Sequence, residues 1–278
     1  MNTKTEPWLV ALDIDGTVLH EDGTLGEAVI IAVQKARDAG HEVTLATGRS
    51  VSMTLPILER LNIVPEYVVC SNGAITLKRD TGAPSGYRRF HVEHFDPADV
   101  LTRIKAKLPQ AHYAVEDETG LYRYTDWFPE GALDALSEQV TFEELLNTDA
   151  TRVVVISPGH EIDDFLAVVE GMGLHQVSYT VGWTAWLDIA PDGVNKSTAL
   201  ERVREALCFP PERVMVIGDG RNDIEMLQWA ATKGRAVAMG QAPDEVRIHA
   251  SEVTKDFLED GVAHALRSLL SEAPRPVL

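Results

Sequence analysis

The sequence predicts an α/β fold, a doubly wound parallel sheet interrupted by an inserted α+β domain. Short apolar runs alternate with amphipathic stretches over residues 8–70, which is the βαβ pattern of a parallel sheet. The same alternation returns over residues 195–239. The residues between them show a different pattern of predicted strands and helices, so we expect the two stretches to form one sheet that an insertion divides.

The predicted elements follow one another in a regular order in both stretches. The first contains strands at 8–13, 42–46 and 67–70 and helices at 26–39 and 52–61, and the second contains helices at 195–207 and 224–230 and strands at 213–217 and 235–239. Gly40 and Asn62 stand where the first two helices should end, because both residue types tolerate the left-handed conformation of a helix C-terminus.

The insertion follows a Gly- and Pro-rich bend at 81–86, which predicts a hairpin between strands at 74–78 and 87–91. Beyond it, the pattern predicts helices at 96–108 and 161–172 and strands at 151–157, 177–181 and 186–189. We therefore expect residues 1–86 and 190–278 to form the core and residues 87–189 to form an inserted α+β cap domain, which is a normal size for a domain.

Composition indicates a soluble globular protein. Its 278 residues are 45% hydrophobic and 24% charged, and they contain no apolar run long enough for a signal peptide or a membrane span, so a cytoplasmic location is expected. A formal net charge of −18 without a basic cluster argues against nucleic acid as a partner, and no membrane or obligatory protein partner is indicated. Cys70 and Cys208 are too few for a disulfide framework, and both are expected to be buried.

Two acids end the first predicted strand. Asp13 and Asp15 follow the apolar run at 8–12 and precede a loop that opens at Gly16. Buried side by side without a partner, two carboxylates would cost several kcal/mol, so a cleft here requires a cation or a set of donors. A lone Asp-x-Asp is more often a solvated loop, but the preceding strand and the following Gly-Thr favour a site.

Three further loops are expected at the same edge of the sheet, where open α/β folds bind ligands. Thr47 and Gly48 follow the second strand and could donate to a phosphate oxygen, although Thr47 could equally be a plain helix cap. Lys196 begins a helix, where an extra positive charge is unfavourable unless an anion lies opposite. Asp219 and Asp223 follow another buried strand and offer the hard oxygen ligands that Mg²⁺ prefers. The glycine spacing of a P-loop is absent around Lys196.

The order of these loops resembles the haloacid dehalogenase superfamily of phosphatases. The matching motifs are Asp13-x-Asp15-Gly16-Thr17-Val18-Leu19, Ala46-Thr47-Gly48-Arg49, Gly193-Val194-Asn195-Lys196 and Gly218-Asp219-x-x-Asn222-Asp223. An insertion between the second and third motifs, preceded by Ser71-Asn72-Gly73-Ala74, resembles the Cof-type branch, whose type IIB cap covers the active site. The resemblance implies a Rossmann-like core and a phosphatase that acts on a small phosphorylated metabolite, most simply a sugar phosphate.

The resemblance also implies the catalytic roles. Asp13 corresponds to the nucleophile that forms an aspartyl-phosphate, and Asp15 to the general acid and base that protonates the leaving oxygen and then activates water. The groups that would hold the phosphoryl oxygens are Thr47, the Gly48 N–H, Lys196 and Asn222.

A Mg²⁺ cofactor is part of the same resemblance. Its ligands would be the carboxylates of Asp13 and Asp219 and the backbone carbonyl of Asp15. Asp223 would orient Lys196 or a water on the metal. Such a cation would allow Asp13 to approach a phosphate dianion that otherwise repels it.

Two other functions remain open on the sequence. A phosphomutase or phosphotransferase would use the same residues to pass the phosphoryl group to another sugar, and a non-catalytic module would use the acidic pocket only to bind metal. Arg49 could contact substrate or form a structural salt bridge. The polar and aromatic cap residues that could contact substrate are His112, Glu116, Arg123, Tyr124, Trp183 and Trp186.

Overall fold

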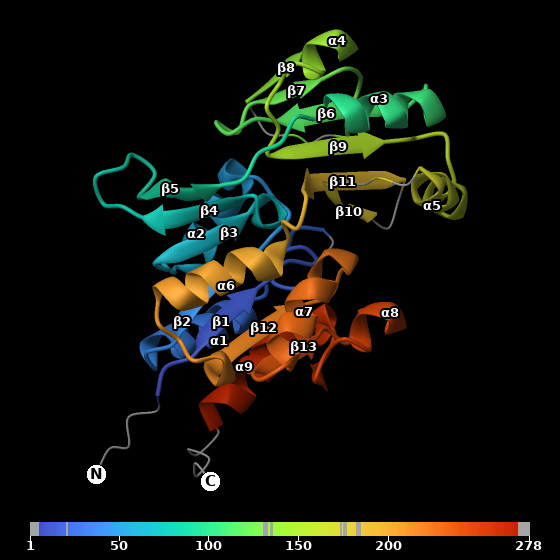
Figure 1. Ribbon diagram of the computed structural model, residues 1–278. Coiled ribbons are helices and arrows are strands. Elements are labelled where there is room, and N and C mark those ends of the chain that lie inside the picture. Colours follow the sequence, from blue (N-terminus) through green and yellow to red (C-terminus); the bar gives the residue numbers. More distant parts are fainter. Residues whose placement is uncertain are drawn as a thin grey trace, which may run out of the picture.

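The central sheet is parallel throughout, as the sequence predicts, and its strand order is β14-β13-β12-β1-β2. Figure 1 labels β13, β12, β1 and β2 of this sheet. Its strands are β1 (Leu9–Leu12), β2 (Glu42–Leu45), β12 (Val214–Gly218), β13 (Arg235–Ala238) and β14 (Glu252–Val253). The computed structural model describes residues 6–20, 22–129, 133, 136–172, 174, 177–181 and 185–271. Every residue of β1, β12 and β13 is buried, which explains why these strands are continuous apolar runs rather than alternating ones.

Helices cover both faces of this sheet. One face carries α1 (Glu27–Asp38), α2 (Val51–Leu61) and α9 (Gly261–Ser271), and the other carries α6 (Lys196–Ala206), α7 (Ile224–Ala231) and α8 (Asp244–Arg247). Val10 and Leu12 of β1 pack on the first set, whereas Leu9 and Ala11 pack on the second, because side chains alternate along a strand. The predicted doubly wound core is confirmed.

The helix boundaries have local causes. Ser50 caps α2 by accepting a hydrogen bond from the Met53 N–H, and Asn62 ends it in the left-handed conformation, with φ 54°. Helix α1 ends at Asp38 with Ala39 as its C-cap, and Gly40 follows with φ 95°. Both predicted helix ends are therefore within one residue of the observed ones.

A three-stranded antiparallel sheet continues the core beyond β2. It consists of β3 (Tyr67–Cys70), β4 (Ile75–Arg79) and β5 (Tyr87–Val92), and a parallel bridge between Ala46 and Val69 joins it to the end of β2. The short helix η1 (Ser71–Gly73) connects β3 to β4. Because β5 pairs with β4, the chain leaves this sheet only after Val92. The division into a core of residues 1–86 and 190–278 and a cap of residues 87–189 stays a prediction.

The inserted segment forms a six-stranded sheet, above the core in the view of Figure 1, in the order β10-β11-β9-β6-β7-β8. Its strands are β6 (His112–Glu116), β7 (Tyr122–Tyr124), β8 (Ser137–Gln139), β9 (Arg152–Ile156), β10 (Val177–Val181) and β11 (Trp186–Pro191). Helices α3 (Ala98–Lys107), α4 (Phe142–Leu145) and α5 (Ile162–Gly171) pack with the apolar face of this sheet. The predicted α+β character is confirmed, although the pattern did not predict β6, β7, β8 or α4.

Two expectations about single features need correction. Cys70 is buried, but Cys208 is exposed, because α6 ends at Ala206 and Cys208 lies in the turn that follows, with φ 57°. Lys196 does not follow a strand of the central sheet; the strand before it, β11, belongs to the cap. Within the described residues, no helix has the length and apolarity that crossing a membrane requires.

Candidate active site

Three adjacent parallel strands end at the candidate site. Asp13 follows β1, Thr47 lies just beyond β2, and Asp219 follows β12, and these strands are neighbours in the order β12-β1-β2. Parallel neighbours present their carboxyl ends at one edge, so the three loops meet although they are far apart in sequence. The Asp13 N–H donates to the Ile217 carbonyl at 2.9 Å, which continues the pairing of β1 with β12 up to the first acid.

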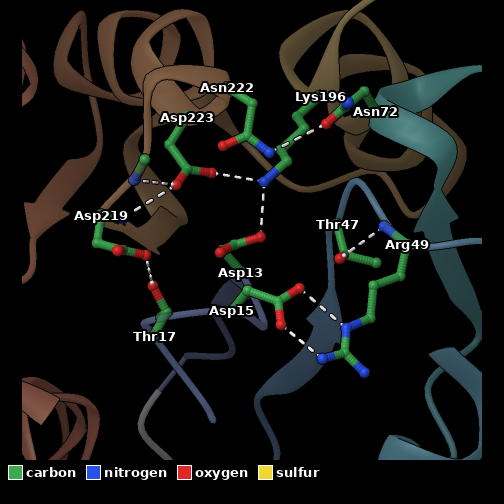
Figure 2. Close-up of polar contacts among 11 residues, drawn as sticks. Asp13, Asp15, Thr17, Thr47, Arg49, Asn72, Lys196, Asp219, Asn222 and Asp223 are labelled. Carbon is green, nitrogen blue, oxygen red and sulfur yellow. Dashed lines mark hydrogen bonds and ion pairs between the residues drawn. The ribbon is translucent and has the colours of Figure 1, made fainter. Parts of the chain in front are cut away.

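Lys196 links two of the acids from above the sheet edge. Its Nζ donates to Asp13 Oδ1 at 2.6 Å and to Asp223 Oδ1 at 2.7 Å (Figure 2), and the lysine is fully buried. Burial disfavours the charged form of Lys196, but the Asp13 and Asp223 carboxylates outweigh it and raise the pKa of the lysine above its ordinary value. These two carboxylates are the anions that a lysine at the start of a helix requires.

Three carboxylates crowd the same point. Within the described part of the chain, oxygens of Asp13, Asp219 and Asp223 lie within 4.8 Å of one another. Burial, followed by the Asp223 charge, raises the pKa of Asp13 well above its ordinary value and that of Asp219 to about 7. The concentration of negative charge fits a divalent cation, because hard cations prefer carboxylate oxygens and would relieve the repulsion.

The three acids are not equivalent as potential ligands. Asp223 uses Oδ1 for Lys196 and Oδ2 for the N–H groups of Asp219 and Gly220, at 3.0 and 2.9 Å. Asp219 accepts from the Thr17 hydroxyl at 2.8 Å. The geometry therefore favours Asp13 and Asp219 as metal ligands, with Asp223 orienting the lysine and the loop.

Gly16 makes room for Asp219. Its φ is 76°, and a Cβ at this position would lie 2.2 Å from Asp219 Oδ2. Only glycine combines this backbone conformation with such a close approach. The Gly-Thr that follows Asp15 thus shapes the acid cluster, since Gly16 gives Asp219 space and Thr17 holds it.

Asp15 lies apart from the three clustered acids and forms a bidentate ion pair with Arg49. Arg49 Nε and Nη2 lie 2.9 and 2.5 Å from Asp15 Oδ2 and Oδ1 (Figure 2). The Asp15 side chain is 61% exposed, so unlike the buried Asp13 it is accessible from solvent. Of the two interpretations of Arg49 that the sequence leaves open, the structure shows the ion pair.

The predicted phosphate-binding residues surround Asn72. Asn222 Nδ2 donates to Asn72 Oδ1 at 3.1 Å, and a Cβ on Gly48 would lie 3.1 Å from that same oxygen. Thr47 is buried, and its Oγ1 accepts from the Arg49 N–H at 3.1 Å. Asn72 had no predicted role, although it follows a buried strand in the same way as the acids do.

The cap candidates are found in different environments. Glu116 is fully buried and accepts a hydrogen bond from Ser71 of the core at 3.0 Å. Arg123 forms ion pairs with Asp117 and Glu138 within the cap. Tyr124 and Trp186 are half-buried and pack with Phe128, and His112 lies beside the same ring. Trp183 lies outside the described residues.

Comparison with known families agrees with this fold and with the motifs. A family model described as haloacid dehalogenase-like hydrolase matches residues 10–266, and the chain belongs to this family. The relatives that match the chain are named phosphatases. The chain is therefore an enzyme, a phosphatase of the Cof-type branch of this family.

Curated relatives match over nearly their full length. The 5-amino-6-(5-phospho-D-ribitylamino)uracil phosphatase YitU of Bacillus subtilis is 26% identical over 96% of this chain and 99% of its own. The pyridoxal phosphate phosphatase YbhA of Escherichia coli is 29% identical over 94% of this chain and 98% of its own.

Solved structures share the fold. A subclass IIB sugar phosphatase of the superfamily has a TM-score of 0.78 at 21% identity and covers 94% of this chain and 98% of its own. A superfamily phosphatase from Bacteroides thetaiotaomicron has a TM-score of 0.74 at 23% identity, with 96% of each chain covered. At these identities, the similarity establishes the common architecture of core and cap.

Proposed function

We propose that the chain is a Mg²⁺-dependent phosphatase that hydrolyses a phosphate monoester of a small metabolite, most simply a sugar phosphate, by way of a phosphoryl group on Asp13. The observation that carries this proposal is the buried chain of contacts from Asp13 through Lys196 to Asp223, with Asp219 beside it. The relatives named for a phosphorylated ribitylaminouracil and for pyridoxal phosphate support a small phosphorylated substrate.

In the first step, an Asp13 oxygen attacks phosphorus while the bond from phosphorus to the ester oxygen breaks. Asp15 gives its proton to that oxygen, and the alcohol leaves. Because Asp15 is held by Arg49 in this structure, the ion pair must open before Asp15 carries a proton to the substrate. Lys196 remains hydrogen-bonded to Asp13 and offers positive charge to the phosphoryl oxygens.

In the second step, water attacks the phosphorus of the aspartyl-phosphate. Asp15 takes a proton from the water, the bond between phosphorus and the Asp13 oxygen breaks, and inorganic phosphate is released. Thr47, Gly48 and Asn222 would hold the phosphoryl oxygens through both displacements. The carboxylates of Asp13 and Asp219 and the backbone carbonyl of Asp15 would hold Mg²⁺, which when bound neutralises the charge between the acids and the phosphate.

The test is a panel of phosphorylated sugars, cofactors and nucleotide precursors, assayed for released phosphate with and without Mg²⁺. Asp13→Asn should abolish phosphate release without loss of fold, and the matched surface variant Asp38→Asn on α1 should remain active. Normal turnover by Asp13→Asn would refute the nucleophile. An isomerised sugar phosphate in place of free phosphate would instead indicate a phosphomutase.

A further inference from the structure

The η1 turn (Ser71–Gly73) has a backbone that must be held in place from outside. Its three residues have φ values of 48°, 51° and 100°, and residues other than glycine rarely adopt this left-handed region. The Ser71 N–H donates to the Arg49 carbonyl at 2.8 Å, and the Asn72 N–H donates to the Thr47 carbonyl at 3.0 Å. The turn is thus attached to the loop that follows β2.

The same turn contacts the other loops of the candidate site. Asn72 Oδ1 holds the Asn222 side chain at 3.1 Å. A Cβ on Gly73 would lie 2.2 Å from the carbonyl oxygen of Asn195, the residue before Lys196. A shift of this turn would therefore be transmitted both to Asn222 and to the start of the helix that carries the lysine.

On its other side, the turn meets a buried carboxylate of the cap. Glu116 Oε2 accepts from the Ser71 hydroxyl and from the Tyr122 hydroxyl, each at 3.0 Å. The Tyr122 oxygen in turn accepts from Arg152 Nη1 at 3.0 Å. Glu116 and Tyr122 are at most 1% exposed, and a buried carboxylate keeps its donors because losing one is costly. Ser71 is the donor in this group that belongs to the core.

We propose that Glu116 is a positioning residue through which the cap keeps the η1 turn in its left-handed conformation and so completes the phosphate site. With the cap in this position, Ser71 is held, Asn72 orients Asn222, and Gly73 packs against Asn195. When the cap moves away, Ser71 loses its acceptor and the turn relaxes. The site is therefore complete only beneath the cap. This inference rests on the proposed phosphatase function.

The experiment compares Glu116→Ala, Ser71→Ala and the double variant by hydrolysis of p-nitrophenyl phosphate with Mg²⁺. Each single variant should lose roughly tenfold or more in kcat/KM, with a matching rise in the inhibition constant of inorganic phosphate. Because both residues act through one contact, the loss in the double variant should be no greater than the larger of the two single losses. Glu116→Gln keeps an oxygen for Ser71 and Tyr122 and should lose less than Glu116→Ala.

Asp117→Asn is the matched control. Asp117 is the next residue along the chain, and the partners of its carboxylate, Thr119, Leu121 and Arg123, all belong to the cap. This variant should stay within about twofold of the unmodified protein, because its contacts do not reach the η1 turn. Retention of kcat/KM by Glu116→Ala, or single losses that multiply in the double variant, would overturn the proposal.

A second measurement separates this inference from the phosphatase proposal. Hydrogen exchange of the Asn72 amide, which donates to Thr47, should be about tenfold faster in Glu116→Ala than in Asp117→Asn. If the unmodified protein hydrolyses no phosphate ester, the phosphatase proposal fails, and the exchange result alone decides whether Glu116 holds the turn. Equal exchange in the two variants would refute the coupling even in an active enzyme.

Discussion

Replacing Lys196 by Met removes the cation between two buried carboxylates. The ammonium donates to Asp13 at 2.6 Å and to Asp223 at 2.7 Å, and lysine and Asp223 are both fully buried. Methionine has a similar length and is apolar, so the variant removes the charge and leaves little empty volume. The two acids then face each other without their shared partner.

The expected loss in the free energy of unfolding is about 3–5 kcal/mol, because removing one partner of a buried ion pair leaves an uncompensated charge. Two charge-assisted hydrogen bonds at about 1.5–3 kcal/mol each give a loss of the same size. An exposed lysine serves as the comparison: Lys233 is 60% exposed and lies 3.9 Å from Glu212. Lys233→Met should change the stability by less than about 0.5 kcal/mol.

The loss should also depend on pH. Lys196 has a raised pKa, so its own contribution is fully present below the unfolded lysine value and is constant over the neutral range. Asp13 has a raised pKa, so its charged form destabilises the fold as pH rises, and Lys196 is the group that offsets this effect. The deficit of Lys196→Met should therefore be larger at about pH 8 than at about pH 5.5, where the acids can protonate.

The assay is urea denaturation of the metal-free protein, followed by fluorescence at both pH values, with Lys233→Met in parallel. A deficit below about 1 kcal/mol at the higher pH would refute the reasoning, since it would mean that the acids are solvated enough to lose their partner at little cost. A deficit that grows towards low pH would refute the sign of the electrostatic argument.

Two further predictions concern the acids. The pKa values of Asp13 and Asp219 are raised by burial and by Asp223, that of Asp219 to about 7, so a divalent cation must displace protons. Affinity for Mg²⁺ should therefore weaken as the pH falls from about 8 to about 6, and equal dissociation constants by titration calorimetry would contradict this. Asp15→Asn should lower kcat/KM for a sugar phosphate by about 10²–10⁴ but for p-nitrophenyl phosphate much less, because kcat/KM reports the first displacement, in which nitrophenolate leaves without a proton. Equal losses on both substrates, with Asp38→Asn unaffected, would count against the acid role.

The core was predictable because its signals are local and repeated. Each parallel strand is a short apolar run, and polar residues directly after it must lie at one edge of the sheet. Asp13, Thr47 and Asp219 therefore lie together, as expected. Asn72 follows β3 in the same way, but β3 pairs with β4 as an antiparallel strand. The contact of Asn72 with Asn222 depends on a left-handed turn, which the hydrophobic periodicity of a sequence does not predict.

The cap and the approach of Lys196 were less predictable. Strand β6 is bounded by His112 and Glu116, and a fully buried glutamate is compatible with a strand because two hydroxyls donate to it, that of Tyr122 in the cap and that of Ser71, which is far away in the sequence. Lys196 was expected at the same sheet edge as the acids. It does begin a helix, α6, as expected, but the strand before it, β11, belongs to the cap sheet and not to the central sheet.

The return of the chain from the cap sheet to α6 has a consequence for exchanging caps between related enzymes. Strand β11 ends at Pro191 and α6 begins at Lys196. The returning linker 192–195 therefore connects the cap sheet directly to the lysine that binds Asp13. The outgoing linker after β5 carries no such residue of the acid cluster. A chimera joined upstream of Pro191 would keep the lysine in register, whereas a change of length within 192–195 would alter the chemistry together with the specificity.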